Sequence, residues 1–398
     1  MATLSTAAVA QAPEAHDRPL VSVVMPCLDE AGTVSACVGA AYDALAEAGL
    51  TGEVVVVDNG SADGSAGLAA QAGARVVLEP RRGYGSAYLA GFASARGRFI
   101  VMGDADGTYE FLALPRFIAE LENGADLVLG SRLRGNIEPG AMPWLHRRVG
   151  NPVLTGILNL FFHTRVSDAH CGLRAFRREL LDRLDLQAMG MELASEQLIR
   201  AAKLGLDVRE IPIDYRPRHG RSKLAPFPDG WRHLRLLLVH SPTWLFLVPG
   251  AAMVLGALVM TVLALAVFGA SSQLLALVVA ALLAIVGSQL LQFGVFARSY
   301  AVWHLGERDA GFERVRRRVS LERVLLVGGV IALVGAGLLT GALLGGTPNG
   351  SGEEKLAVAG LSLLVLGTQV VFGAFLLSIL GLRRRRSDFG ARADQGRA

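Results

Sequence analysis

Short apolar runs alternate with helix-spaced segments along the N-terminal part of the chain. The run Leu20–Met25 is apolar and β-branched and ends at Pro26, which predicts a buried strand. Thr33–Ala48 has apolar residues at helical spacing, with Thr33 as the expected N-cap and Gly49 after the end. Continuous apolar strands that alternate with helices indicate a mostly parallel sheet covered on both faces, so the predicted fold class is α/β. The predicted strands are Leu20–Met25, Glu53–Val57, Arg75–Leu78, Phe99–Met102 and Asp126–Leu129.

The C-terminal part has a different pattern, because it holds long stretches without any Asp, Glu, Lys or Arg. Such stretches run from Leu236 to Ala297, from Val324 to Gly352 and from Leu356 to Leu382. Each is longer than the roughly 20 apolar residues that cross a bilayer as a helix, and the first is long enough for two crossings. The pattern excludes a wholly soluble protein. The predicted transmembrane helices are residues 244–269, 273–296, 324–345 and 356–382.

These patterns divide the chain into parts. Just before the apolar stretches, the segment WRHLRLLLVH places Arg232 and Arg235 away from its leucines, as in a helix that lies along a membrane surface. The first residues are Ala-rich and polar, which is typical of a disordered leader rather than a signal peptide. The predicted parts are the leader (1–19), a globular domain (20–225), an amphipathic juxtamembrane helix (226–243), four transmembrane helices (244–382) and a basic tail (383–398).

The net charge of the chain and the positions of its basic residues indicate which partners to expect. The net charge of +4 is too small to indicate nucleic acid, and much of the basic excess flanks the apolar stretches, so anionic lipid headgroups are the expected partners. The loop Ala297–Arg323 and the tail Arg383–Arg386 are rich in arginine. The positive-inside rule therefore predicts an integral protein of the cytoplasmic membrane, with the globular domain and both termini in the cytoplasm. The three cysteines are widely spaced, which favours reduced thiols.

Acidic residues follow three of the predicted strands. Asp29 and Glu30 come after the first strand, Asp58 after the second, and Asp104 and Asp106 after the fourth. Ligands of open α/β sheets bind at the carboxyl ends of the strands. Carboxylates that converge there repel one another unless a cation or hydrogen-bond donors lie among them. Their hard oxygens suit Mg²⁺ or Mn²⁺, with phosphates completing the ligand shell.

An ordered set of motifs resembles a known family. The motifs are VSVVMPCLDE, VVVVDNGSADGS, RRGYGSAYLAGF, VMGDADGTYEF, LVLGSR, DAHCGLRAFRR and EIPIDYRPRHGRSK, between Leu20 and Lys223. In this order they resemble the family 2 glycosyltransferases, within them the polyprenyl-phosphate (dolichol-phosphate mannose or glucose synthase-like) branch. The resemblance implies a Rossmann-like GT-A fold. It also implies inverting transfer of a hexose from a nucleotide-diphosphate sugar, of the GDP-mannose or UDP-glucose type, to polyprenyl phosphate for cell-envelope glycan or glycoconjugate synthesis.

The resemblance also implies roles for individual residues. Gly83 and Gly85 would let the backbone pass close to the ligand. The implied nucleotide-sugar-binding residues are Pro26, Glu30, Asp58, Gly60, Ser61, Arg82 (or Arg81, on the diphosphate), Gly83, Gly85 and Asp104. The implied catalytic residues are Asp104, Asp106 and Asp168, with Asp168 facing the sugar and with Asp106 and Asp104 as metal ligands. The implied acceptor-phosphate-binding residues are Arg132, Arg147, Arg218, Ser222 and Lys223.

Two positions depart from the family pattern. The second acidic residue of the D-D-G-S turn is Asn59 here, which loosens the expected recognition of the base. The glutamine that often ends the D-A-D-x-Q motif is Thr108, so the loop offers fewer metal ligands, and Glu110 or water is expected to compensate.

Several alternatives stay open. A processive polysaccharide synthase shares the catalytic domain, but such enzymes usually carry a Q-x-x-R-W motif before the spans, and none occurs here. A non-catalytic membrane scaffold would be expected to lose its carboxylates, which are present. The sugar, the base and a homo-oligomeric state are left open. Glu196 either pairs with Arg200 at i,i+4 or shapes the acceptor side, and His170 is expected to be a packed histidine.

Overall fold

The computed structural model describes residues 18–218, 220, 226–304, 311–314, 320–345 and 351–395. The chain forms two compact units, Met1–His240 and Ser241–Ala398. Most of the predicted leader, the acceptor residues Ser222 and Lys223, and much of the basic loop lie outside the described residues.

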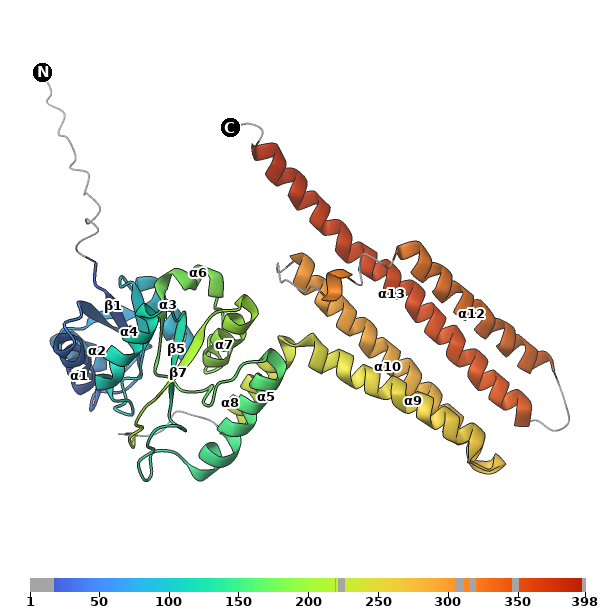
Figure 1. Cartoon of the computed structure of the whole chain (residues 1–398), viewed down its shortest axis with the longest axis horizontal. Helices are drawn as coiled ribbons and strands as arrows, with labels where there is room; N and C mark the ends of the chain where they lie inside the picture. The colour runs from blue at the N-terminus through green and yellow to red at the C-terminus, as the bar shows by residue number, and fades with distance from the viewer. Residues whose placement is uncertain are drawn as a thin grey trace, which may run out of the picture. The chain divides into compact units, whose positions relative to one another are not determined.

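The first unit is built on a seven-stranded sheet in the order β3-β2-β1-β4-β6-β5-β7 (Figure 1). All pairs are parallel except those that β6 makes with β4 and β5. The five predicted strands are confirmed with small shifts at their ends, and β6 and β7 were not predicted. The strands are β1 (Val21–Cys27), β2 (Gly52–Asp58), β3 (Arg75–Leu78), β4 (Phe99–Met102), β5 (Leu127–Ser131), β6 (Arg174–Arg177) and β7 (Val208–Pro212).

Helices cover both faces of this sheet, as the continuous apolar strands predicted. Val23 and Met25 of β1 face a core with α1 and α4, whereas Val24 faces a second core with α3 and α7. The helices of the unit are α1 (Val34–Glu47), α2 (Ser65–Gln71), α3 (Tyr84–Ser94), α4 (Leu114–Glu122), α5 (Asn151–Phe162), α6 (Leu181–Leu184), α7 (Leu193–Leu204) and α8 (Pro226–Val239), with single turns η1 (Phe111–Ala113), η2 (His146–Gly150) and η3 (Arg178–Leu180).

The register of the sheet brings the carboxyl ends of β1 and β2 together. Cys27, the last residue of β1, is opposite Asp58, the last residue of β2, and Pro26 lies inside β1 opposite Val57. β1 lies between β2 and β4, where the order of strands along the chain reverses. Such a switch point is where open α/β sheets bind their ligands.

Helix α8 is part of the first unit. Its Leu237 is fully buried in the core with α3 and α7, while Phe227 and Trp231 are exposed. The amphipathic pattern of this helix therefore buries one face against the globular unit and leaves aromatic side chains in solvent.

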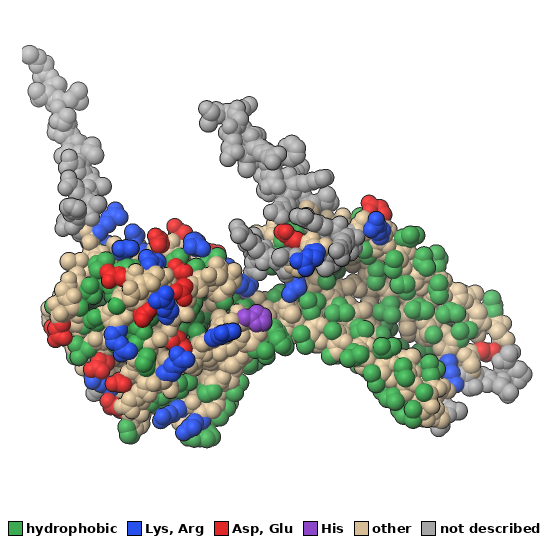
Figure 2. All heavy atoms as spheres, viewed as in Figure 1, with side chains coloured by type: hydrophobic (Ala, Val, Ile, Leu, Met, Phe, Trp, Pro, Cys, Tyr) green, Lys and Arg blue, Asp and Glu red, His purple; other side chains and the backbone are tan. Residues whose placement is uncertain are grey.

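The second unit consists of long apolar helices. Four helices are long and apolar enough to cross a membrane, which confirms the predicted four: Thr243–Ala266, Ser272–His304, Leu321–Leu344 and Gly352–Gly381. Hydrophobic side chains are spread over the face of this unit that Figure 2 shows. α12 and α13 pack at close range, because a Cβ on Gly335 would lie 2.3 Å from the Leu364 nitrogen. The elements are η4 (Thr243–Leu247), α9 (Val248–Ala266), α10 (Ala270–His304), α12 (Leu321–Leu344) and α13 (Ser351–Gln395), the last of which extends into the predicted basic tail.

Candidate active site

The loops that follow β1 and β2 are bonded to each other. Asp29 accepts from the Ala62 N–H at 2.8 Å, and its own N–H donates to the Ser61 hydroxyl at 3.0 Å. The Ala31 N–H donates to Asp63 at 2.9 Å. Asp29 adopts a left-handed backbone conformation (φ 51°) that turns the chain toward these partners. Hydrogen bonds therefore join the two loops that are predicted to hold the nucleotide.

Asn59 fixes the end of β2 to the segment before α3. Its side-chain amide donates to the backbone oxygens of Glu79 and Arg81, both at 2.8 Å, and its oxygen accepts from the Gly83 N–H at 2.7 Å. An aspartate at this position would lack the two donated bonds. Asn59, where the family pattern has an acidic residue, therefore holds the end of β2 to the segment before α3 by hydrogen bonds.

Of the two arginines expected near a diphosphate, only Arg82 lies at the turn after β2. Its guanidinium donates to the Gly60 backbone oxygen at 3.3 Å, where Gly60 takes a positive φ of 89°. Asp58 accepts from the Ser61 N–H at 3.3 Å and so closes this turn. Arg81 instead pairs with Glu79 at 2.9 Å.

Asp104 is held by two tyrosines of α3. Its Oδ1 accepts from the Tyr84 hydroxyl at 3.1 Å and from the Tyr88 hydroxyl at 3.2 Å. Burial, together with the charge of Asp106, raises the pKa of Asp104 to about 7. Sequence reasoning missed both tyrosines, although they lie in the quoted segment RRGYGSAYLAGF.

Asp106 and Glu30 share one guanidinium. Asp106 Oδ1 accepts from the Thr108 hydroxyl at 2.6 Å and from its N–H at 3.1 Å. Asp106 Oδ2 lies 3.4 Å from Nη1 of Arg218, and Nη2 of Arg218 pairs with Glu30. The structure thus brings together a predicted metal ligand, a predicted nucleotide residue and a predicted acceptor residue.

The donor set at this point fits a divalent cation that also binds phosphate. Asp104 and Asp106 lie near each other and offer hard carboxylate oxygens, and the guanidinium of Arg218 already pairs with Asp106 and Glu30. Within the described residues, no group of three or more His, Cys, Asp or Glu side chains forms a complete metal site. Mg²⁺ usually takes only one or two protein carboxylates and completes its shell with water and phosphates.

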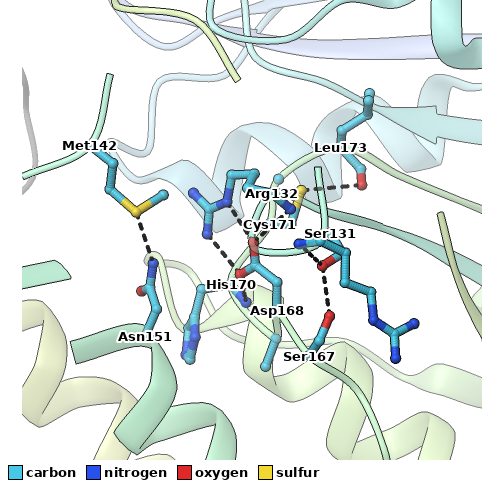
Figure 3. Close-up of polar contacts among 12 residues, drawn as sticks. Ser131, Arg132, Met142, Asn151, Ser167, Asp168, His170, Cys171 and Leu173 are labelled. Atoms are coloured by element: carbon cyan, nitrogen blue, oxygen red, sulfur yellow. Dashed lines mark hydrogen bonds and ion pairs between the residues drawn. The ribbon is translucent and has the colours of Figure 1, made fainter. Parts of the chain in front are cut away.

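Asp168 has a different environment from the one that the resemblance implies. Its side chain is fully buried, and it accepts from Nε of Arg132 at 2.7 Å and from Nη2 at 2.9 Å (Figure 3). The guanidinium of Arg132 also lies over the ring of Tyr215, 5.1 Å from its centroid. Asp168 therefore does not face an open sugar site in this structure; it is the counter-ion of the predicted acceptor residue Arg132.

The chain after Asp168 is anchored by Arg174, which sequence reasoning did not single out. Arg174 is fully buried in β6 and donates to the backbone oxygens of Cys171, Ala194 and Ala169 at 2.6–2.7 Å. Three carbonyl partners compensate for the desolvation of its charge. These bonds join the DAHCG loop to α7.

Gly83 and Gly85 make room for the chain's own backbone. A Cβ on Gly83 would lie 2.3 Å from the Met189 oxygen, and one on Gly85 would lie 2.1 Å from the Ala188 oxygen. The Ser86 N–H donates to the same Met189 oxygen at 3.1 Å. The absence of a Cβ at these two glycines therefore makes room for the segment before α7, and the close approach of a ligand to their backbone stays a prediction.

Glu196 holds that segment in place. Its buried carboxylate accepts from the backbone N–H groups of Gln187 and Ala188 at 2.9 and 2.8 Å. Arg200 pairs with Asp185 at 3.8 Å. Of the two alternatives left open for Glu196, the ion pair with Arg200 is therefore not the one found, and its carboxylate binds the backbone of the loop instead.

His170 is a packed histidine, as expected. It is edge-to-face with His233 of α8 at 4.6 Å between ring centroids, and the Ser195 hydroxyl lies 3.4 Å from His170 Nε2 and 2.8 Å from His233 Nδ1. Burial, with His233 nearby, lowers the pKa of His170 well below its usual value. The cluster connects the DAHCG loop to α8.

Arg147 lies on an exposed segment rather than at the carboxylates. It lines a hollow of about 400 Å³ with Met142, Trp144 and Arg148. Among the described residues it shares no ion pair with Asp106, Glu30 or Asp168, in contrast to Arg218 and Arg132. Trp144 is 71% exposed, so this segment presents an aromatic side chain beside two arginines.

A mostly parallel sheet with paired aspartates after β4 and a bonded loop surface after β1 and β2 is the architecture of a GT-A glycosyltransferase. Comparison with known proteins agrees. Residues 22–185 match the domain described as glycosyl transferase family 2, and residues 295–381 match the family 2 C-terminal transmembrane region.

A curated relative matches most of the chain, and others match about half of it. The low-salt glycan biosynthesis hexosyltransferase Agl6 of Haloferax volcanii is 42% identical over 91% of this chain and 89% of its own length. A dolichyl-phosphate hexose transferase of the same organism is 38% identical over 45% of this chain and 76% of its own. Glucosyl-3-phosphoglycerate synthase of Mycobacterium tuberculosis, crystallised with Mg²⁺ and UDP, is 24% identical with a TM-score of 0.46 over 57% of this chain and 80% of its own. The chain belongs to glycosyltransferase family 2 and is a membrane glycosyltransferase with hexosyltransferase relatives.

Proposed function

We propose that this protein transfers a hexose, with inversion, from a nucleoside-diphosphate sugar to polyprenyl phosphate at the cytoplasmic face of the cytoplasmic membrane. The product, polyprenyl-phosphate-hexose, would supply the synthesis of cell-envelope glycans or glycoconjugates. The observation that carries the proposal is the contact of Arg218 with Asp106 and Glu30, because it joins the basic segment before α8 to the carboxylates at the switch point of the sheet. The carboxyl edge of the sheet thus combines carboxylates that would bind a cation with a guanidinium that would bind a phosphate.

The chemistry needs little acid–base assistance from the chain. A lipid phosphate is already ionised at neutral pH, so the difficult step is to bring two anions together and to stabilise the departing nucleoside diphosphate. A divalent ion held by Asp106 and Asp104 would offset the charge on that leaving group. Arg82 at the Gly60 turn would bind the diphosphate, since guanidinium groups offer two parallel donors to phosphate oxygens.

The exposed segment with Trp144, Arg147 and Arg148 supports delivery of the acceptor from a membrane. Aromatic side chains favour the interface between water and lipid, and arginines attract phosphate headgroups. The dolichyl-phosphate hexose transferase among the relatives supports the same acceptor class.

The proposal is tested in membranes that contain the protein. Membranes are incubated with polyprenyl phosphate and a panel of labelled nucleotide sugars, and the lipid product is identified by mass spectrometry. Asp106→Ala is expected to abolish transfer, while Asp43→Ala, at an exposed position of α1, is expected to retain it. Polymer without a lipid-linked monosaccharide, or full transfer by Asp106→Ala, would refute the proposal.

A further inference from the structure

Arg218 occupies the place of a cation at the candidate active site. Its guanidinium lies between the carboxylates of Glu30 and Asp106, and the side chains of all three are mostly buried. Of the two Asp106 oxygens, Oδ1 is bonded to Thr108, and Oδ2 is the one that faces Arg218. The guanidinium therefore covers the Asp106 oxygen that is left for a metal ion.

A divalent cation and this guanidinium exclude each other. Both are positive, and at a separation of a few ångströms in a partly buried site their repulsion is strong. Both also require the same carboxylate oxygen. A cation that binds Asp106 must therefore displace Arg218.

The position of Arg218 in the chain allows that displacement. Two residues earlier, the Arg216 N–H donates to the Thr108 oxygen at 3.0 Å, and the Arg216 side chain pairs with Glu110 at 3.0 Å. Arg218 itself lies beyond this anchored point. Its buried Nε has no hydrogen-bond partner among the described residues, so the observed position leaves one donor unused.

We propose that Arg218 is a positioning residue that stands in for the cation at Asp106 until the cation and a nucleoside diphosphate bind together. The diphosphate offers the displaced guanidinium new oxygens and supplies phosphate ligands to the cation. Displacement from the carboxylates makes Arg218 available to a phosphate. This inference rests on the proposed function for the identity of the ligands.

The test measures binding of Mn²⁺ to the full chain in detergent, by electron paramagnetic resonance of the free ion, with Mn²⁺ alone and with Mn²⁺ plus UDP or GDP. Arg218→Gln is expected to bind Mn²⁺ alone roughly tenfold or more tightly than the wild type, because a competing charge is gone. Added nucleotide should strengthen Mn²⁺ binding to the wild type much more than to this variant. Arg218→Lys keeps the positive charge and should resemble the wild type.

The matched control is Arg209→Gln. Arg209 lies on β7 and also pairs with two carboxylates, those of Glu120 and Asp207. This variant should leave Mn²⁺ affinity unchanged. The proposal is overturned if Arg218→Gln binds Mn²⁺ alone no more tightly than the wild type, or if no variant binds Mn²⁺ with or without nucleotide. This measurement uses neither sugar nor lipid. If the Arg218 effect is found but no lipid product forms in membranes, the proposed function is refuted and the inference about Arg218 stands.

Discussion

The buried ion pair between Asp168 and Arg132 allows a prediction of stability that is independent of activity. Asp168→Asn preserves the shape of the side chain and removes its charge. Only 8% of the Arg132 side chain is exposed, so its guanidinium would stay in the interior without a counter-ion. Burial alone would lower the pKa of Arg132, and the charge of Asp168 is the largest influence that raises it above its usual value.

The expected cost follows from this burial. Removing one partner of a buried pair destabilises a protein by about 3–5 kcal/mol. The side-chain oxygen of the introduced asparagine would still accept one bond, which favours the lower end, about 3 kcal/mol. With a urea dependence of about 3 kcal/mol per M for a domain of this size, the unfolding midpoint should fall by about 1 M.

The three cysteines provide the assay. Cys27, Cys37 and Cys171 are all buried in the first unit, and the chain has no others, so their alkylation in urea reports unfolding of that unit in the intact protein in detergent. Glu120→Gln is the control, because it breaks a pair with Arg209 whose side chains are both more than a third exposed. Exposed pairs contribute about 0–1 kcal/mol. If Asp168→Asn shifts the midpoint no more than this control, the buried pair does not stabilise the unit as argued.

Three further outcomes are expected. The Arg132 guanidinium outweighs burial and lowers the pKa of Asp168. The stability that the pair contributes is therefore present above the unfolded pKa of about 3.9 and is lost as pH falls through the lower folded pKa. The difference in urea midpoint between wild type and Asp168→Asn, measured with a thiol reagent that reacts in acid, should decrease below about pH 4. Gly85→Ala places a Cβ 2.1 Å from a backbone oxygen and should destabilise the first unit by about 1–3 kcal/mol in the urea assay, whereas Gly67→Ala, with nothing within 4 Å, should be neutral or stabilising. Gly335→Ala should lower the thermal stability of the helical unit in detergent, and Gly337→Ala, which meets open space, should not.

Hydrophobic patterning predicted most of the sheet but not β6 or β7. β6 has the sequence RAFR, and Arg174 interrupts the apolar run that identifies a buried strand. The residue is tolerated there because carbonyl groups from α7 and the DAHCG loop receive its donors. β7 is an edge strand with mostly half-exposed residues, so its pattern resembles that of a loop. In both cases tertiary contacts outweigh the local signal.

The candidate site was predictable where topology alone decides it. Parallel strands deliver their carboxyl ends to one edge, so Asp58 and Asp106 could be placed from the sequence. The partners of these groups were not predictable, because hydrogen bonds between distant segments have no periodic signature. Asp104 accepts a hydrogen bond from Tyr84, and Glu196 accepts hydrogen bonds from the backbone before α7, whereas the i,i+4 spacing left a pair with Arg200 equally open.

The charges at the switch point explain how these carboxylates coexist before any ligand binds. Burial makes ionisation of Asp104 costly, and tyrosine hydroxyls bond to it. Arg218 offsets Glu30 and Asp106. Arg132 is paired with Asp168 instead. The proposed divalent cation would therefore enter a site whose charge is already compensated, and it would need further anions to release Arg218. The diphosphate of the proposed donor would supply those anions, so the ion pairs of Arg218 predict that cation and nucleotide bind more tightly together than either does alone.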